Sequence, residues 1–282
     1  MFIKKITEFI LFSSIFIAAC AVALSIETNL LLHLPLNNFS FYSFVFGATL
    51  VQYNLHYMVK TTAVKNSQRL AWSLKNKNLH KILFGIGCAL ILISIFSFRL
   101  HHFIILSILG AIAFLYSFPV IPFGKGKRIK DYGFFKIITL ALLWTLVTVW
   151  FPVSDMALNK NVFLFVFGKR FIFMFVLCLL FDIRDIDIDR KENIKTLAVI
   201  LGKKKSYFIA NFVLLLFIIL SAVQYIYLGG SGVFTAMLVS AVVTFLTIQV
   251  TKKTNSDFVY LAGSDGMMLL QAALVYLLSL KL

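Results

Sequence analysis

The sequence predicts an all-α protein, a polytopic bundle of about nine transmembrane helices that forms one domain over residues 1–282. Composition is the first reason: 61% of the residues are hydrophobic, 13% are charged and 31 are phenylalanine, far too apolar for a soluble domain of this length. The second reason is that the apolar residues form charge-free runs long enough to cross a bilayer. Both observations exclude a soluble protein.

The charge-free runs give the expected spans in order along the chain. They cover residues 7–26, 38–59, 80–98, 102–123, 134–152, 161–181, 204–228, 232–250 and 258–280. The stretch from Ser206 to Val250 holds no charge and is long enough for two helices, and the Leu-Gly-Gly-Ser-Gly sequence at 228–232 supplies the turn between them. We expect Lys169 and Arg170, early in the sixth span, to snorkel outward or to line the outer part of a cavity.

The net charge of +16 follows from membrane topology. Most of the 27 basic residues gather at the N-terminus and in alternate connections, above all in 60–81, 125–136 and 184–205. The positive-inside rule places these connections in the cytoplasm, with the N-terminus inside and the C-terminus outside. We therefore expect a bacterial-type cytoplasmic membrane protein whose active side faces the cytoplasm, and no nucleic-acid partner.

Five of the 11 acidic residues follow the sixth apolar run within one short string, Asp182, Asp185, Asp187, Asp189 and Glu192. On a continuous helix, the first, second and fourth of these would project from one face. Like charges at such spacings destabilise a bare helix, so the face is best explained by a bound divalent cation. Oxygen ligands favour Mg²⁺ or Ca²⁺, and Mg²⁺ usually also binds substrate phosphates, which suggests a diphosphate ligand.

The string from Asp182 to Gly202, DIRDIDIDRKENIKTLAVILG, resembles the second aspartate-rich motif of the UbiA superfamily of intramembrane prenyltransferases. That motif reads DxxDxxxD, followed by Thr-Leu and Leu-Gly. Tyr116-Ser117-Phe118-Pro119 and the basic loop from Lys125 to Lys130 are similar to the family's Tyr-Ser-x-Pro segment and basic loop. Nine helices with a cytoplasmic N-terminus also fit the family's fold over essentially the whole chain.

The resemblance implies a Mg²⁺-dependent transferase that moves an isoprenyl group from a prenyl diphosphate to a lipophilic or aromatic acceptor. Asp182, Asp185 and Asp189 would be the catalytic and metal-binding residues. The residues expected to bind the donor are Asn54, Lys65, Arg69, Tyr116, Lys125, Lys127, Arg128 and Lys130.

The family's first aspartate-rich motif is not preserved. Its counterpart begins at Asn54, and Leu55, Met58 and Thr62 stand where the family has aspartates. No carboxylate occurs between Glu27 and Asp131. Fixed cations near Asn54, such as Lys65 and Arg69, are therefore expected to neutralise part of a diphosphate in place of a metal.

Two other functions stay open at this stage. A catalytically silent family member would bind an isoprenoid, a quinone-like lipid or a partner protein, as the missing first motif suggests. A transporter is suggested by Asp265 inside the last span, for which an interhelical hydrogen bond is the simplest expectation. The donor chain length, the acceptor and the oligomeric state are not encoded in these patterns.

Overall fold

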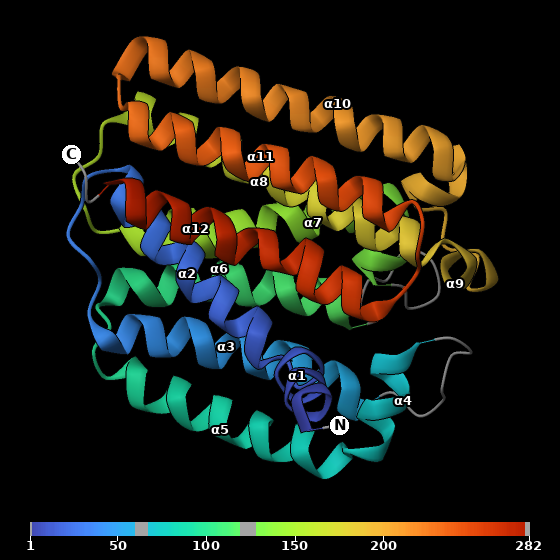
Figure 1. Cartoon of the computed structure of the whole chain (residues 1–282). Helices are drawn as coiled ribbons and strands as arrows, with labels where there is room; N and C mark the ends of the chain where they lie inside the picture. Colours follow the sequence, from blue (N-terminus) through green and yellow to red (C-terminus); the bar gives the residue numbers. More distant parts are fainter. Residues whose placement is uncertain (1, 60–66, 119–127, 280–282) are drawn as a thin grey trace.

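The computed structural model describes residues 2–59, 67–118 and 128–279, and its regular structure in these ranges is entirely helical (Figure 1). Most helices lie side by side along one bundle axis (Figure 1). The long helices are α2 (Ile15–Leu31), α3 (Phe39–Val59), α5 (Lys77–Ile95), α6 (Leu100–Ser117), α7 (Phe134–Thr145), α8 (Lys160–Arg184), α10 (Leu197–Leu228), α11 (Ser231–Thr251) and α12 (Gly266–Ser279). The short elements are α1 (Phe2–Phe12), α4 (Gln68–Lys75), α9 (Ile186–Lys191), the 3-10 turns η1 (Ile129–Asp131) and η3 (Phe151–Val153), and the π-helices η2 (Leu146–Trp150) and η4 (Val259–Asp265).

The described helices confirm an all-α membrane fold. Seven helical segments are long and apolar enough to cross a membrane, and the bent pair Lys4–Phe12 and Ile15–Leu31 raises that number to eight. α3 has 21 residues and follows the expected span 38–59 closely, but it is not among those eight. The count of nine spans and the cytoplasmic N-terminus therefore stay predictions.

Two spans differ from the expected ones. The first was expected to run unbroken over 7–26, but the chain bends by 61° between α1 and α2. Ser14 forms this break in a left-handed conformation, with φ of 72°. The seventh begins earlier than expected, at Leu197, and is kinked at Gly202, where φ of 77° favours glycine.

α8 forms the centre of the bundle. Its buried apolar face packs against α7 and α10, and Phe173, Val176 and Leu180 are fully enclosed. α5 and α6 lie at the periphery and expose large apolar side chains such as Ile93 and Ile104, as expected of surfaces that face lipid. The polar end of α8 is thereby held at a fixed position among the other helices.

A buried ion pair joins α2 to α8. Arg170 Nη2 lies 3.0 Å from Glu27 Oε2, and the two side chains are 1% and 0% exposed. Arg170 Nη1 also donates to the Leu24 carbonyl at 3.2 Å and to Thr148 Oγ1 at 3.3 Å. The expectation that Arg170 snorkels outward is thus wrong, because an acidic partner inside the bundle holds it.

α3 and α5 approach each other closely at two glycines. A Cβ at Gly47 would lie 2.8 Å from the Gly87 carbonyl oxygen, and a Cβ at Gly87 would lie 2.8 Å from the Gly47 oxygen. Small residues at a crossing let two membrane helices pack backbone to backbone. This contact holds α5 beside α3.

We predict that Gly87→Ala lowers stability by about 1–3 kcal/mol, because the added methyl group forces the two backbones apart. Gly85→Ala is the matched control on the same helix, since no atom lies within 4 Å of its added Cβ. Thermal unfolding in detergent measures both. Equal unfolding temperatures for the two variants would contradict the close crossing.

Candidate active site

The acidic string lies at one end of the bundle, where α8 ends and α9 begins, at the right of Figure 1. The string was expected to form one helix, but α8 ends at Arg184 and Asp185 separates it from α9. The carboxylates consequently form two groups. Asp182 and Asp189 face α7, and Asp185 pairs with Arg184.

Lys136 on α7 lies between Asp182 and Asp189. Its Nζ is 2.9 Å from Asp182 Oδ1 and 2.9 Å from Asp189 Oδ2. Both aspartates are buried, at 4% and 5% exposure. Burial raises the pKa of Asp189, and the nearby Lys136 ammonium opposes that shift. Asp182 Oδ2 is buried and has no hydrogen-bond partner in the part of the chain that the structure describes.

Gly133 places Lys136 at this position. It precedes α7 with φ of 36°, and a Cβ there would overlap the Lys195 carbonyl oxygen. Only glycine combines this conformation with so close an approach. The start of α7 therefore packs directly against the segment that follows α9, and the first turn of α7 carries Lys136 to the two carboxylates.

A second charged group connects α8 to α4. Arg184 Nε is 2.8 Å from Asp185 Oδ1, and Arg184 Nη1 is 3.3 Å from Asp257 Oδ1. Asp257 Oδ2 accepts the amide N–H of Arg69 at 2.9 Å and the hydroxyl of Ser67 at 3.0 Å. Asp257 thus joins the segment before η4 to the N-terminus of α4 and the end of α8.

Arg69 is buried, with 8% exposure, although it carries a charge. Its guanidinium lies over the Tyr57 ring at 4.7 Å and donates to Ser14 Oγ at 3.2 Å. The bend between α1 and α2 supplies that hydroxyl. No carboxylate forms an ion pair with Arg69 among the described residues, and its Nε is buried without a hydrogen bond. Its charge remains available to an anion.

Asn54 is fully buried and already satisfied. Its Nδ2 donates to the Leu50 carbonyl at 2.9 Å, and its Oδ1 lies 2.6 Å from His80 Nδ1. His80 in turn stacks on Tyr57, with ring centroids 5.3 Å apart. In this structure Asn54 orients His80, whose ring stacks on the Tyr57 ring that also contacts Arg69. The expected binding of the donor by Asn54 stays a prediction.

The remaining expected donor-binding residues are only partly described. Tyr116 lies near the C-terminus of α6, and this helix packs against η1 and α7. Arg128 is held by Asp131, with Nη2 2.8 Å from Oδ1. The side chain of Lys130, and all of Lys65, Lys125 and Lys127, lie outside the described residues.

The sequence reasoning missed Lys136, Arg184 and Asp257. Membrane topology alone explains basic residues on this side, so no pattern in the sequence singles out Lys136 and Arg184. Asp257 could have been noticed as a carboxylate at the start of the last span, close to Lys252 and Lys253. Asp257 is 5% exposed. The last part of the chain thus contributes a buried carboxylate to this end of the bundle.

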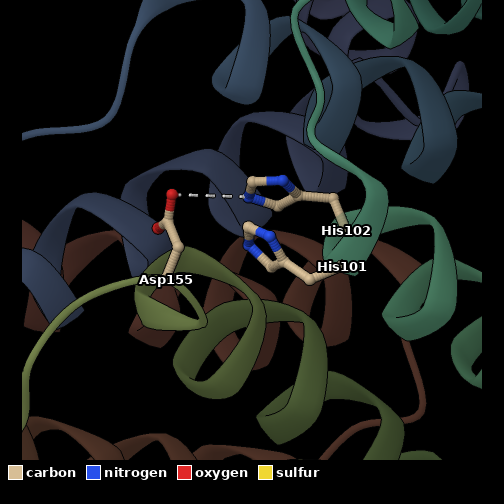
Figure 2. A group of neighbouring side chains, drawn as sticks. All are labelled: His101, His102 and Asp155. Atoms are coloured by element: carbon tan, nitrogen blue, oxygen red, sulfur yellow. Dashed lines mark ion pairs between the residues drawn. The ribbon is translucent and has the colours of Figure 1, made fainter.

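The opposite end of the bundle holds a different group, His101, His102 and Asp155 (Figure 2). The three are close enough for a metal ion, but their hydrogen bonds do not suit one. His102 Nδ1 accepts the amide N–H of Arg99 at 3.1 Å, so in the neutral ring Nε2 carries the proton and offers no lone pair. Arg99 also lies 3.8 Å from Asp155. We interpret the group as a helix cap with its ion pairs.

The site residues of α8 and α9 do fit a magnesium ion. They offer only oxygen donors, and Mg²⁺ binds through one or two carboxylates together with water and phosphate. Asp182 and Asp189 provide two buried carboxylates, of which Asp182 Oδ2 has no partner. A net negative charge remains after Lys136 is counted.

Comparison with known proteins identifies the family. The chain is first of all an integral membrane α-helical protein with a charged site at one end of the bundle. The model of the UbiA prenyltransferase family matches residues 73–259, and the chain belongs to that family. A search of curated proteins gives no match.

Solved structures share the fold over nearly the whole chain. A digeranylgeranylglyceryl phosphate synthase aligns with a TM-score of 0.59 at 18% identity and covers 99% of each chain. A UbiA homologue from Archaeoglobus fulgidus bound to GPP and Mg²⁺ aligns with a TM-score of 0.56 at 12% identity, over 95% of this chain and 99% of its own. The same homologue bound to Cd²⁺ gives 0.56 at 11% identity, over 94% and 99%. At these identities the likeness shows a common fold.

We predict that Asp257→Ala loosens α4. The change leaves Arg184 short of a partner and removes the acceptor of the Arg69 amide, at a cost of about 1–3 kcal/mol. Hydrogen exchange of the α4 amides should accelerate, and exchange in α10 should not. Asp187→Ala is the control, because Asp187 is 71% exposed and pairs with the exposed Arg190. Unchanged protection of α4 would show that Asp257 does not fix this helix.

Proposed function

We propose that the protein is a membrane prenyltransferase that moves an isoprenyl group from a prenyl diphosphate to a lipophilic or aromatic acceptor, with Mg²⁺ as cofactor. Family membership supports the reaction class. The observation that carries the proposal is the buried pair Asp182 and Asp189 around Lys136, with one carboxylate oxygen left unpaired. Buried unpaired oxygens are costly unless a ligand completes them.

Asp182 and Asp189 would hold the Mg²⁺, with Asp185 one turn away assisting. When bound, the cation would stabilise the negative charge that the leaving diphosphate acquires. Arg69, Lys136 and Arg184 supply positive charge from the protein itself, in fixed positions that need no reorganisation during the reaction. Lys65, Lys125, Lys127, Arg128 and Lys130 are further candidates for the diphosphate.

The transfer we propose breaks the C1–O bond of the donor, and diphosphate leaves with the bonding electrons. The acceptor then forms a new bond to C1. Aromatic rings near the cations would line the path of the prenyl group and exclude water. Tyr57 lies against Arg69, and Phe181 and Tyr260 lie against Arg184, with ring-to-guanidinium distances of 4.7, 4.9 and 5.6 Å.

We place this end of the bundle at the cytoplasmic face of the membrane. The basic connections on either side of α9 support that orientation through the positive-inside rule. Water-soluble diphosphate and metal would then reach the site from the cytoplasm, and the isoprenyl chain would enter from the bilayer.

The direct test incubates the purified protein in detergent with Mg²⁺ and geranyl, farnesyl or geranylgeranyl diphosphate. A lipophilic phenol, a quinol and a prenylated glycerol phosphate serve as candidate acceptors. We predict diphosphate release and a prenylated product for at least one pair, and a loss of about 100-fold or more in Asp182→Asn and Asp189→Asn. Asp187→Asn should keep the parental rate.

A catalytically silent family member is the second candidate, favoured by the absence of any carboxylate from residue 28 to residue 130. Such a protein would bind the same prenyl diphosphates without releasing diphosphate. Donor binding without turnover under all these conditions would therefore support the silent protein and contradict the transferase.

We further predict that Lys136→Met increases the affinity for Mg²⁺ by about tenfold or more, because an ammonium that competes for the two carboxylates is removed. Without metal, the variant should unfold at a lower temperature than the parent, since two buried carboxylates lose their partner. Addition of Mg²⁺ should restore its stability at a lower concentration than the parent needs.

Arg190→Met is the control for Lys136→Met, because Arg190 is exposed and pairs with the exposed Asp187. Differential scanning fluorimetry over a Mg²⁺ titration measures all three proteins. The same Mg²⁺ response in Lys136→Met and in the parent would mean that the cation does not bind at Asp182 and Asp189.

A further inference from the structure

Asp265 is a buried carboxylate in the interior of the bundle, and its side chain has no partner in the part of the chain that the structure describes. It ends η4 within the last span and is 7% exposed. Among the described residues, Asp265 is the buried acid whose side chain neither accepts a hydrogen bond nor forms an ion pair. The interhelical hydrogen bond of Asp265 is made by its backbone oxygen, which accepts from Cys20 Sγ at 3.5 Å, and the expected bond to its side chain is not found within the described ranges.

A carboxylate in this environment is unfavourable to the fold. Burial of an unpaired polar group costs free energy, and ionisable residues inside membrane spans therefore mark functional positions by default. The backbone points to the same conclusion. η4 is a π-helix, a rare form that occurs frequently at functional sites. Ser264, just before Asp265, likewise has a buried hydroxyl without a hydrogen bond.

The contacts of η4 place Asp265 in the interior of the bundle. Its backbone oxygen accepts a hydrogen bond from Cys20 Sγ on α2, and η4 packs against α8, α11 and α12. Cys20 follows Ser14, the hydrogen-bond partner of Arg69, by six residues along α2, a rise of about 9 Å. Asp265 thus lies deeper in the bundle than the charged groups at the end of α8.

The other carboxylates of this end are already engaged. Asp182 and Asp189 share Lys136, Asp185 pairs with Arg184, and Asp257 accepts three groups. Among the described residues, neither Arg69 nor Arg184 forms an ion pair with Asp265. Asp265 is therefore the carboxylate free to accept a proton from a ligand in the interior.

We propose that Asp265 is the catalytic base of the transfer, an inference that rests on the proposed function. The C1–O bond of the donor breaks and diphosphate leaves with its electrons. The acceptor atom forms its bond to C1 and loses its proton to the Asp265 carboxylate, which becomes a neutral acid. Such a base requires an acceptor whose reacting group carries a hydroxyl or another acidic hydrogen.

The test uses Asp265→Asn, which keeps the shape of the side chain and removes its basicity. The variant should lower prenylation of the acceptor by about 100-fold or more, as expected for loss of a general base, while diphosphate release from the donor alone changes less than about threefold. The assay uses the donor and acceptor pair that supports turnover by the unchanged protein. Asp187→Asn is the matched acid-to-amide control.

A second measurement separates a catalytic from a structural role. Thermal unfolding of Asp265→Asn should occur at a temperature no lower than that of the parent, because the variant loses an unpaired buried charge. A clear decrease would reveal a structural partner and overturn the proposal. Parental acceptor prenylation, or an equal loss of prenylation and donor cleavage, would also overturn it. If the unchanged protein releases no diphosphate at all, the proposed function itself fails, and this inference fails with it.

Discussion

The site depends on the position of one ammonium group between two buried carboxylates. Asp182 and Asp189 could not both stay ionised in the interior without a cation, and Lys136 supplies it at 2.9 Å from each. Two features of the backbone make this contact possible. Gly133 allows α7 to approach the chain that follows α9, and the break at Asp185 directs Asp189 toward Lys136. One net negative charge and one unpaired oxygen remain for a ligand cation.

Two arginines, on α4 and α8, are also held in place at this end of the bundle. Arg69 is held by Ser14 and Tyr57, and Arg184 by Asp185 and Asp257. A diphosphate bound between these arginines and the Asp182 and Asp189 pair would contact protein cations on one side and the carboxylate pair on the other. The chain has no acid group between residues 28 and 130, and Asp257 and Asp265 are acid groups from its last part.

The sequence alone predicted the membrane bundle, because apolar runs and basic connections are long patterns that tertiary contacts do not alter. It also located the acidic string, whose charges have no place in a lipid-facing helix. It could not show that Arg170 turns inward to Glu27, because that requires knowing which helices adjoin. The break at Asp185 and the bend at Ser14 were missed for the same reason, since Lys136 and Arg69 stabilise them from distant segments. The sequence did not single out Lys136, because membrane topology explains every basic residue on that side equally well.

Asp182, Asp189 and the fixed cations form the diphosphate site that we propose. The most direct measurement is an experimental structure of the protein with Mg²⁺ and an unreactive prenyl thiolodiphosphate. We predict that the diphosphate lies between the Asp182 and Asp189 pair and the side chains of Arg69 and Arg184, with its prenyl chain extending past Asp265. A diphosphate bound elsewhere, with Lys136 still bridging both aspartates and no cation beside them, would contradict it.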